Sequence, residues 1–156
     1  MQYNYDFEIM SLVIFVVISG HFLLIRQFPT VKSKVFGRLL WVCLGECIAN
    51  ILSCIGLANA AIVPLIWNEL FAFAFFALEG LCSYCIFSYM LTVCDLEKGS
   101  GRGIRVMGLI PFLFFEVMVI VNVWKPFFYY FDDGQYYQGE GAWFGYAYIV
   151  YYFLLN

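Results

Sequence analysis

The feature that most constrains this chain is a series of long apolar segments separated by short polar connections. The first of them, Ile9–Ile25, contains no formally charged residue. A helix needs about 20 predominantly apolar residues to cross the hydrocarbon core of a bilayer. Only 12% of all residues are charged and 64% are hydrophobic, whereas a soluble domain carries about 25% charged residues. We therefore predict an integral membrane protein of the cell membrane, with the lipid bilayer as a partner.

The apolar segments predict an all-α, polytopic membrane helix bundle. The last segment, Trp143–Asn156, has about 14 residues and would reach only about 21 Å as a helix. The hydrocarbon core is about 30 Å thick, so we expect the chain to be a fragment of a longer protein, truncated in its fifth helix. The whole of 1–156 is then one membrane domain, with helices over about 7–26, 36–57, 66–94, 104–124 and 142–156.

A polar and aromatic stretch separates the fourth and fifth predicted helices. Asp132, Asp133 and Gly134 stand between Tyr and Phe residues, and an Asp-Gly pair between aromatic strand formers is a strong hairpin signal. We predict a β-hairpin over about 127–138, outside the membrane. Its aromatic residues, among them Tyr136, are interpreted either as a lid over a pocket or as packing on the rim of the bundle, and we favour the lid.

The basic residues give an orientation. Seven of the eight Lys and Arg residues flank the first and third connections between helices, and the hairpin has only Lys125. Cytoplasmic loops carry an excess of Lys and Arg, which predicts a multi-pass protein with its N-terminus and hairpin outside. The sequence has no basic patch that would suit nucleic acid. The seven residues are Arg26, Lys32, Lys34, Arg38, Lys98, Arg102 and Arg105.

Three carboxylic acids fall near the middle of predicted membrane helices. Glu46, Glu79 and Glu116 would each cost about 2.5–3.5 kcal/mol or more at the centre of a bilayer, so we expect them to face the bundle interior. Asn50 lies on the same helix face as Glu46. This polar layer is either a ligand pocket or proton relay, or a set of protonated carboxyl groups that pack between helices. Glu69 is interpreted as an interfacial residue.

The remaining reactive residues predict little chemistry. His21, the one histidine, could pair with Glu46 and titrate near neutral pH, but a neutral hydrogen-bond donor between helices is the favoured interpretation. The spacing Cys82-Ser-Tyr-Cys85 inside an apolar helix favours small packing residues over a zinc or redox site. We find no catalytic set, metal site or cofactor motif. Asp132, Asp133 and Glu140 are interpreted as turn and rim residues rather than a cation site.

The hairpin segment resembles one protein family. The segment Phe128-Tyr129-Tyr130-Phe131-Asp132-Asp133-Gly134-Gln135-Tyr136-Tyr137-Gln138-Gly139 is followed by an aromatic helix start at Trp143–Tyr148. This pattern is similar to the N-terminal multi-helix membrane sensory domain of Firmicutes GGDEF diguanylate cyclases. The same domain is found on sensor histidine kinases. The resemblance implies a hairpin between the fourth and fifth membrane helices, with Gly139 part of its pattern, and a cytoplasmic output domain further along the protein. This chain contains no part of a catalytic domain, so no enzymatic residue is assigned to it.

The sequence thus favours a transmembrane signal-input domain. A small molecule or a membrane state of unknown identity would shift the helices that carry the carboxylates, and the output would be cyclic di-GMP signalling. A homodimer is left open. The alternative is a small transporter or proton-coupled membrane carrier that uses the same three carboxylates, and it predicts paired broken helices. A third reading is a membrane-embedded assembly partner without a ligand.

Overall fold

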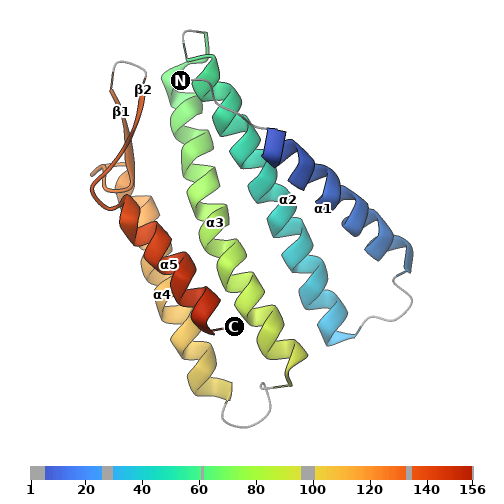
Figure 1. Cartoon of the computed structure of the whole chain (residues 1–156). Helices are drawn as coiled ribbons and strands as arrows, with labels where there is room; N and C mark the ends of the chain where they lie inside the picture. The colour runs from blue at the N-terminus through green and yellow to red at the C-terminus, as the bar shows by residue number, and fades with distance from the viewer. Residues whose placement is uncertain (1–5, 26–29, 61, 96–100, 133–134, 156) are drawn as a thin grey trace.

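The fold is an all-α bundle with a small antiparallel sheet at one end (Figure 1). The structure, a computed structural model, describes residues 6–25, 30–60, 62–95, 101–132 and 135–155. Five helices and two strands lie in the described residues, which confirms the predicted fold class at the level of a helix bundle. They are α1 (Asp6–Ile25), α2 (Val31–Ala58), α3 (Leu65–Val93), α4 (Gly101–Asn122), β1 (Tyr129–Asp132), β2 (Gln135–Gln138) and α5 (Ala142–Leu155).

Helix α2 begins earlier than the sequence suggested. We expected it from Phe36, with the basic residues before it in a loop, but it begins at Val31. The reason is an N-cap: the side chain of Thr30 accepts a hydrogen bond from the backbone N–H of Ser33 at 3.1 Å, which satisfies one of the free donors at the helix start. Lys32 and Lys34 therefore lie on the first turns of α2.

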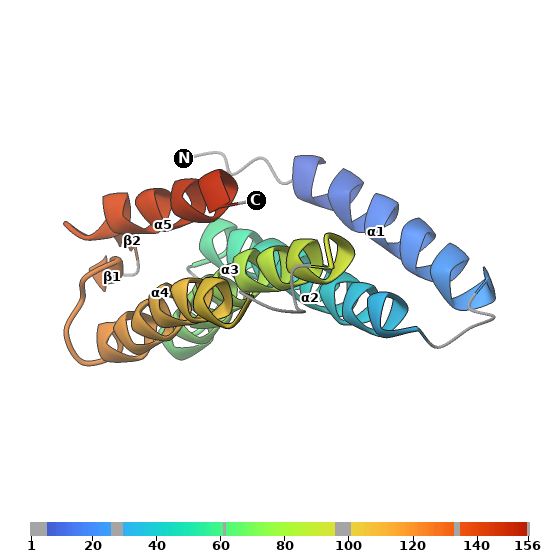
Figure 2. The same cartoon turned by 90° about the horizontal axis from the view of Figure 1, so that it is seen from below.

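The helices form two layers. Helices α4, α3 and α2 lie in a row, and α5 and α1 lie over the same side of that row, one at each end (Figure 2). Within the row α3 packs on both α2 and α4, while α1 packs on α2 and α5 packs on α3 and α4. Aromatic contacts join α1, α2 and α3, since the Phe22 and Phe36 rings lie 5.2 Å apart and those of Phe36 and Tyr89 5.4 Å apart.

Among the described residues, three helices are long and apolar enough to cross a membrane: α2, α3 and the part of α4 from Gly103 onward. Two further apolar segments, Ile9–Ile25 and α5, are shorter. The outer surface of the bundle is apolar as well, with Leu24 87% and Phe153 80% exposed. A soluble protein rarely leaves apolar patches of this extent uncovered, so the fold is consistent with a membrane protein.

Aromatic side chains build the core between α3, α4 and α5. Phe115 on α4 is fully buried and stacks on Tyr148 of α5, with ring centroids 4.2 Å apart. Phe87 on α3 contacts Tyr152 edge to face at 5.7 Å. This core also receives Phe128 from the segment before β1, which is fully buried.

Tyrosine hydroxyls fasten α5 to the other helices. The Tyr148 hydroxyl donates to the carbonyl of Gly80 on α3 at 2.9 Å, and the Tyr151 hydroxyl donates to Met107 O on α4 at 2.8 Å. The Tyr152 hydroxyl donates to the carbonyl of Gly108 on α4. A side chain at Gly108 would meet the Phe87 ring, so this glycine lets α3 and α4 approach closely.

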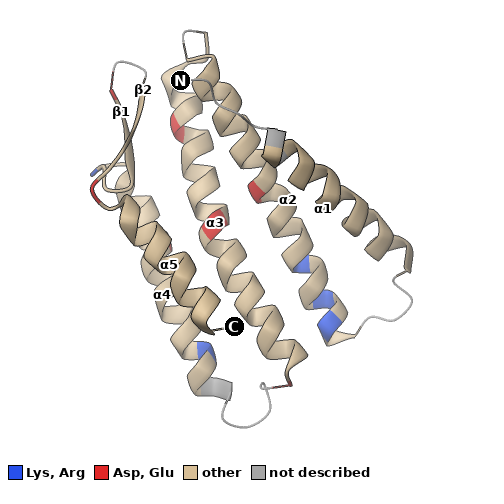
Figure 3. Ribbon diagram, in the orientation of Figure 1, with Lys and Arg blue, Asp and Glu red and all other residues tan. Residues whose placement is uncertain are grey.

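Most of the described basic residues gather at one end of the bundle (Figure 3). Lys32, Lys34 and Arg38 lie near the start of α2, and Arg105 lies near the start of α4, at the same end of the molecule. Lys32 forms an exposed ion pair with Asp95 at 3.1 Å, which contributes little to stability because both groups are solvated. The hairpin with Asp132 lies at the opposite end.

Candidate functional site

The hairpin has two distinct faces. In its register Tyr130 pairs with Tyr137 and Phe131 pairs with Tyr136, and successive residues of a strand point to opposite faces. Tyr129, Phe131 and Tyr136 share the face toward α3, where the Tyr129 and Tyr136 rings stack at 6.1 Å. Tyr130 and Tyr137 stack at 5.3 Å on the other face, and both are 41% exposed. The predicted hairpin is therefore present, with its aromatic residues sorted between an inner and an outer face.

Asn122, the last residue of α4, holds the chain that leads into the hairpin. Its side-chain oxygen accepts hydrogen bonds from the backbone N–H groups of Phe127 at 2.7 Å, Phe128 at 2.6 Å and Tyr129 at 3.4 Å. Its amide nitrogen donates to the carbonyl of Tyr129 at 3.1 Å. The residue is buried. The Asn122 side chain thus pairs with the backbone groups of the segment that follows α4, and it fixes where β1 starts.

The hairpin also packs on the bundle through aromatic rings. The Phe128 ring contacts Phe115 of α4 at 5.3 Å and stacks on Phe76 of α3 at 5.7 Å. The Tyr129 ring lies nearly parallel to Phe76, at 5.2 Å and 8°. Aromatic pairs with these spacings add about 0.5–1.5 kcal/mol each beyond the area they bury. The hairpin therefore packs against α3 and α4 as part of the same aromatic core.

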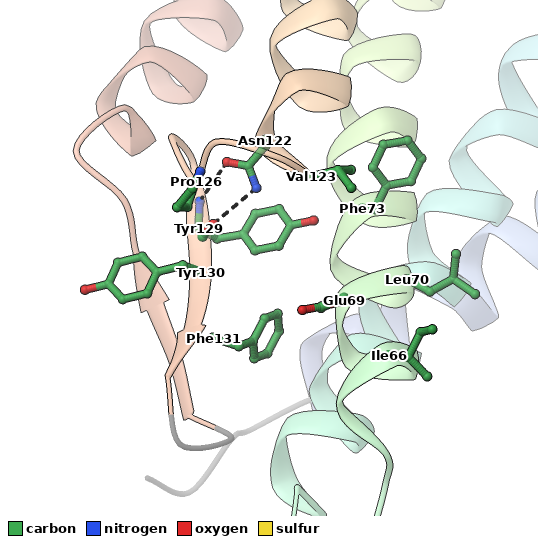
Figure 4. A pocket seen from close by; sticks show the side chains of 10 residues that line it. All are labelled: Ile66, Glu69, Leu70, Phe73, Asn122, Val123, Pro126, Tyr129, Tyr130 and Phe131. Atoms are coloured by element: carbon green, nitrogen blue, oxygen red, sulfur yellow. Dashed lines mark hydrogen bonds between the residues drawn. The ribbon is translucent and has the colours of Figure 1, made fainter.

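A pocket of about 490 Å³ opens between the hairpin, the start of α3 and the end of α4. Figure 4 shows its wall of ten side chains, with Glu69 of α3 pointing toward the space between Tyr129 and Phe131. Tyr130 points away from this space. The volume lies in the range of about 300–1,000 Å³ that small-molecule sites occupy. The lining residues are Ile66, Glu69, Leu70, Phe73, Asn122, Val123, Pro126, Tyr129, Tyr130 and Phe131.

The electrostatics of this pocket centre on Glu69 and Tyr129. Burial raises the pKa of Tyr129 to about 12, and the carboxylate of Glu69 acts in the same direction. Each effect disfavours the phenolate, so the Tyr129 hydroxyl stays protonated at physiological pH. Glu69 is exposed, and among the ten residues of the wall it is the one that carries a formal charge. The pocket therefore combines a single negative charge with aromatic walls.

A smaller pocket of about 140 Å³ lies under the other strand of the hairpin. It is lined by Tyr136 from β2, by Asn50, Ser53 and Cys54 from α2, and by residues of α3. The Cys54 thiol donates to the side-chain oxygen of Asn50 at 3.8 Å. The structure thus brings together two residues that the sequence singled out separately, Asn50 and Tyr136.

The three carboxylates of the predicted polar layer are partly buried on α2, α3 and α4. Glu46 and Glu79 lie close enough to interact electrostatically, and Glu79 and Glu116 both interact with Tyr148 of α5. One oxygen of Glu116 is buried and has no hydrogen-bond partner within the described residues. Glu79 is thus within electrostatic range of both Glu46 and Tyr148, and the role of the predicted polar layer stays a prediction.

The possible partner that the sequence offered for Glu46 is His21 on α1. His21 is exposed on α1, and no ion pair between His21 and Glu46 occurs in the described part of the chain. The sulfur atoms of Cys43 on α2 and Cys82 on α3 lie 3.4 Å apart in a buried contact, so Cys82 contacts a cysteine of another helix. The described residues contain no group of three or more potential metal ligands.

The other hairpin residues singled out from the sequence are Asp132, Asp133, Gly134 and Gly139. Asp132 is exposed and pairs with Gln135 at the end of the ladder, while Asp133 and Gly134 lie outside the described residues. The Gly139 N–H donates to the carbonyl of Phe128 at 2.8 Å. A side chain at Gly139 would meet the backbone of Phe127, so glycine is required by the close approach of these two segments.

Two residues of the pocket escaped the sequence analysis as functional candidates. Glu69 was interpreted as interfacial, and Asn122 was not singled out. A polar residue at the end of a long apolar helix, a few residues before an aromatic hairpin, is the signal that could have identified Asn122 as an anchor.

At the basic end of the bundle a third pocket, of about 250 Å³, has Arg38 of α2 and Arg105 of α4 in its wall. Two guanidinium groups in one wall suit an anion.

In comparisons with protein-family models, with curated proteins and with solved structures, this chain finds no match.

Proposed function

We propose that this chain is the signal-input domain of a membrane signalling protein and that its ligand site is the pocket beneath the hairpin. The observation that carries the proposal is the pocket itself. An open pocket of about 490 Å³ lies between α3, α4 and β1, with one carboxylate in its wall. A pocket with apolar walls and a few convergent polar groups is the usual form of a small-molecule site.

A covalent path leads from the hairpin toward the opposite end of the bundle, as far as the level of Met107 and Gly108 on α4. Strand β2 runs through Gly139–Gly141 into α5, and α5 is held to α3 and α4 by the hydroxyls of Tyr148, Tyr151 and Tyr152. If the hairpin can adopt a second position, a ligand that binds the two positions with different affinities would shift the equilibrium between them, and α5 would move with the hairpin. In this proposal α5 is the element that carries the signal, with Glu79 and Glu116 beside its hydrogen bonds.

The same proposal places the hairpin outside the cell. The positive residues Lys32, Lys34, Arg38 and Arg105 gather at the opposite end, which supports a cytoplasmic location for that end. The hairpin end carries Asp132, Glu69 and Glu140, together with the exposed ring of Trp124. Tryptophan is enriched at membrane interfaces.

Thiol labelling of intact cells tests this topology. We expect a membrane-impermeant maleimide to label the thiol introduced by Glu140→Cys, because Glu140 is exposed at the hairpin end. The native Cys94, which is exposed at the basic end, should react only after the cells are permeabilised. The unsubstituted chain controls for the other cysteines. Labelling of Cys94 in intact cells, with the introduced thiol protected, would reverse the proposed orientation.

The output we propose is cyclic di-GMP synthesis by a GGDEF domain of a longer protein. The support is the resemblance of the hairpin segment to the sensory domain of diguanylate cyclases. The coding sequence that contains this chain should then encode a Gly-Gly-Asp/Glu-Glu-Phe motif further along, and its expression should raise cellular cyclic di-GMP above that of a vector control.

Removal of the α5 hydroxyls tests the relay in that longer protein. We expect the combined variant Tyr148→Phe, Tyr151→Phe and Tyr152→Phe to change cyclic di-GMP output by about fivefold, the lower end of typical allosteric coupling. The matched control is Tyr146→Phe, because Tyr146 is 63% exposed and should leave the output unchanged. If the coding sequence lacks the motif, the proposed output is wrong. If the triple variant and Tyr146→Phe have the same output, the proposed relay through α5 is wrong.

The carrier alternative draws less support from the geometry. It expects paired discontinuous helices around a central site. Each described helix is continuous, and α4 runs without a break through Pro111. We therefore propose the signal-input function alone.

A further inference from the structure

We propose that the pocket beneath the hairpin binds a small organic ammonium ion, with the cationic group beside Glu69 and the apolar body against the aromatic wall. The inference rests on the proposed function in taking this pocket as the ligand site. It goes further in naming the chemistry of the ligand. Three properties of the pocket support this inference. They are the negative charge of Glu69, the faces of its aromatic rings, and the hydrogen bonds that already occupy the Asn122 amide.

The charge of the pocket selects for a cation. Glu69 points into the pocket (Figure 4), and in the described part of the chain it takes part in no ion pair. Its carboxylate is therefore available to a ligand, and an ammonium group would make a charge-assisted hydrogen bond with it. An anionic ligand would be repelled by the same group, since no wall residue carries a compensating positive charge.

The ring faces favour an organic cation over a metal ion. Phe73, Tyr129 and Phe131 line the pocket around Glu69, and Tyr129 and Phe131 lie 6.1 Å apart at an angle of 81°. Two rings at a steep angle form two sides of a cage, and the faces of such rings attract ammonium groups. A hard metal ion would need several oxygen ligands, whereas this wall offers one carboxylate.

The amide of Asn122 does not compete for the ligand. Both its oxygen and its nitrogen are engaged with the backbone of Phe127–Tyr129, so it shapes the pocket without adding a free polar group. The apolar remainder of the wall, with Ile66, Leu70 and Val123, would bury the hydrocarbon part of the ligand. The expected ligand is therefore amphipathic, with one charge at one end.

An ammonium group of this kind has two sources. It can belong to a soluble amine outside the cell or to the headgroup of an amine-bearing phospholipid in the outer leaflet. The chemistry at Glu69 is the same for both, and the test below separates them by the choice of lipid.

The binding test uses two probes that differ in charge. Phenethylammonium is the probe, and 2-phenylethanol is its neutral counterpart of similar shape. Isothermal titration of the purified chain in a maltoside detergent, without amine buffers or amine lipids, should show saturable binding of phenethylammonium at pH 7. We expect the neutral probe to bind about tenfold more weakly, because it lacks the charge-assisted bond.

Substitutions locate the site. Glu69→Gln should weaken phenethylammonium binding by about tenfold and leave 2-phenylethanol unchanged. The matched control is Glu140→Gln, since Glu140 is an exposed acid at the same end that does not line the pocket. Phe131→Leu keeps the apolar volume and removes a ring face, so it should weaken binding of the cation more than that of the alcohol. Near-ultraviolet circular dichroism of each variant reports whether the aromatic core is intact.

Nanodiscs then identify the source. Phenethylammonium should bind in discs of phosphatidylglycerol alone. If added phosphatidylethanolamine displaces it, the headgroup is the natural occupant, and if it does not, the ligand is a soluble amine. Equal binding of the two probes, an unchanged affinity in Glu69→Gln, or no saturable binding of the cation in detergent would overturn the ammonium site. These results leave the relay test on cyclic di-GMP output untouched, so failure of the ligand class and failure of the proposed function are distinguishable.

Discussion

Replacement of Phe115 by alanine is expected to lower the free energy of unfolding by about 3 kcal/mol. The Phe115 ring is fully buried, and it joins the three parts of the aromatic core. It stacks on Tyr148 of α5 at 4.2 Å and contacts Phe128 of the hairpin segment at 5.3 Å. Alanine would leave a cavity that the neighbouring rings cannot fill without moving, because they are fixed by Gly80 O and Asn122. The measurement is unfolding in mixed micelles with an increasing mole fraction of dodecyl sulfate.

The adjacent residue is the control for this prediction. Phe114 lies on the same helix, is 53% exposed and makes an edge contact with the Phe144 ring of α5 at 5.6 Å, so Phe114→Ala removes the same ring from a position that is half open to the surroundings. In a bilayer the surroundings are apolar, and loss of a lipid-facing ring costs little because packing, rather than transfer from water, holds such helices together. We expect a loss below about 1 kcal/mol. Equal losses for the two variants would mean that Phe115 does not occupy the core position described above.

Replacement of Asn122 by alanine is expected to release the hairpin from the bundle. The change removes the acceptor for the N–H groups of Phe127, Phe128 and Tyr129 and the donor to Tyr129 O. Phe128 and Tyr129 are buried, so their N–H groups cannot turn to water instead. A buried donor without a partner costs about 1–3 kcal/mol. We expect a total loss of about 3 kcal/mol and fast hydrogen exchange at these three amides.

Two further variants serve as controls for Asn122→Ala. Asn122→Asp keeps the side-chain oxygen that accepts the three N–H groups and replaces the amide nitrogen, the donor to Tyr129 O, by a second oxygen. It should therefore retain most of the exchange protection. Asn59→Ala removes another asparagine at a helix end, whose amide donates to Ile55 O at 2.9 Å in an exposed position. Its loss should stay below about 1 kcal/mol, since water replaces an exposed hydrogen bond. Protection of the three amides that survives in Asn122→Ala would contradict the anchoring role.

The hairpin illustrates what could be predicted from local sequence. Asp133 and Gly134 between aromatic residues indicate a turn, and the alternation of aromatic residues on either side indicates paired strands. The observed pairing of Phe131 with Tyr136 follows from that pattern. The pattern does not say where the hairpin docks, since docking depends on Phe76 and Phe115, which belong to two other helices.

The candidate site was harder to predict because its residues come from separate segments. The sequence drew attention to Glu46, Glu79 and Glu116, since charged groups in apolar helices are conspicuous. Glu69 is equally acidic, but near a helix end it carries no such signal. Its importance comes from the hairpin, whose residues Tyr129 and Phe131 follow it by about sixty positions in the chain and face it across the pocket.

Composition and the lengths of the apolar segments determined that this chain forms helices suited to a bilayer. Every backbone donor and acceptor in a long apolar segment has to be satisfied within that segment, and only local information is needed for that. The tertiary structure decided the rest: the anchoring by Asn122, the hydrogen bonds from Tyr148 and Tyr152 to glycine carbonyls, and the pocket around Glu69. Each of these features depends on how closely two segments distant in the sequence approach each other. That distance is set by side-chain size and ring packing once the helices have come together.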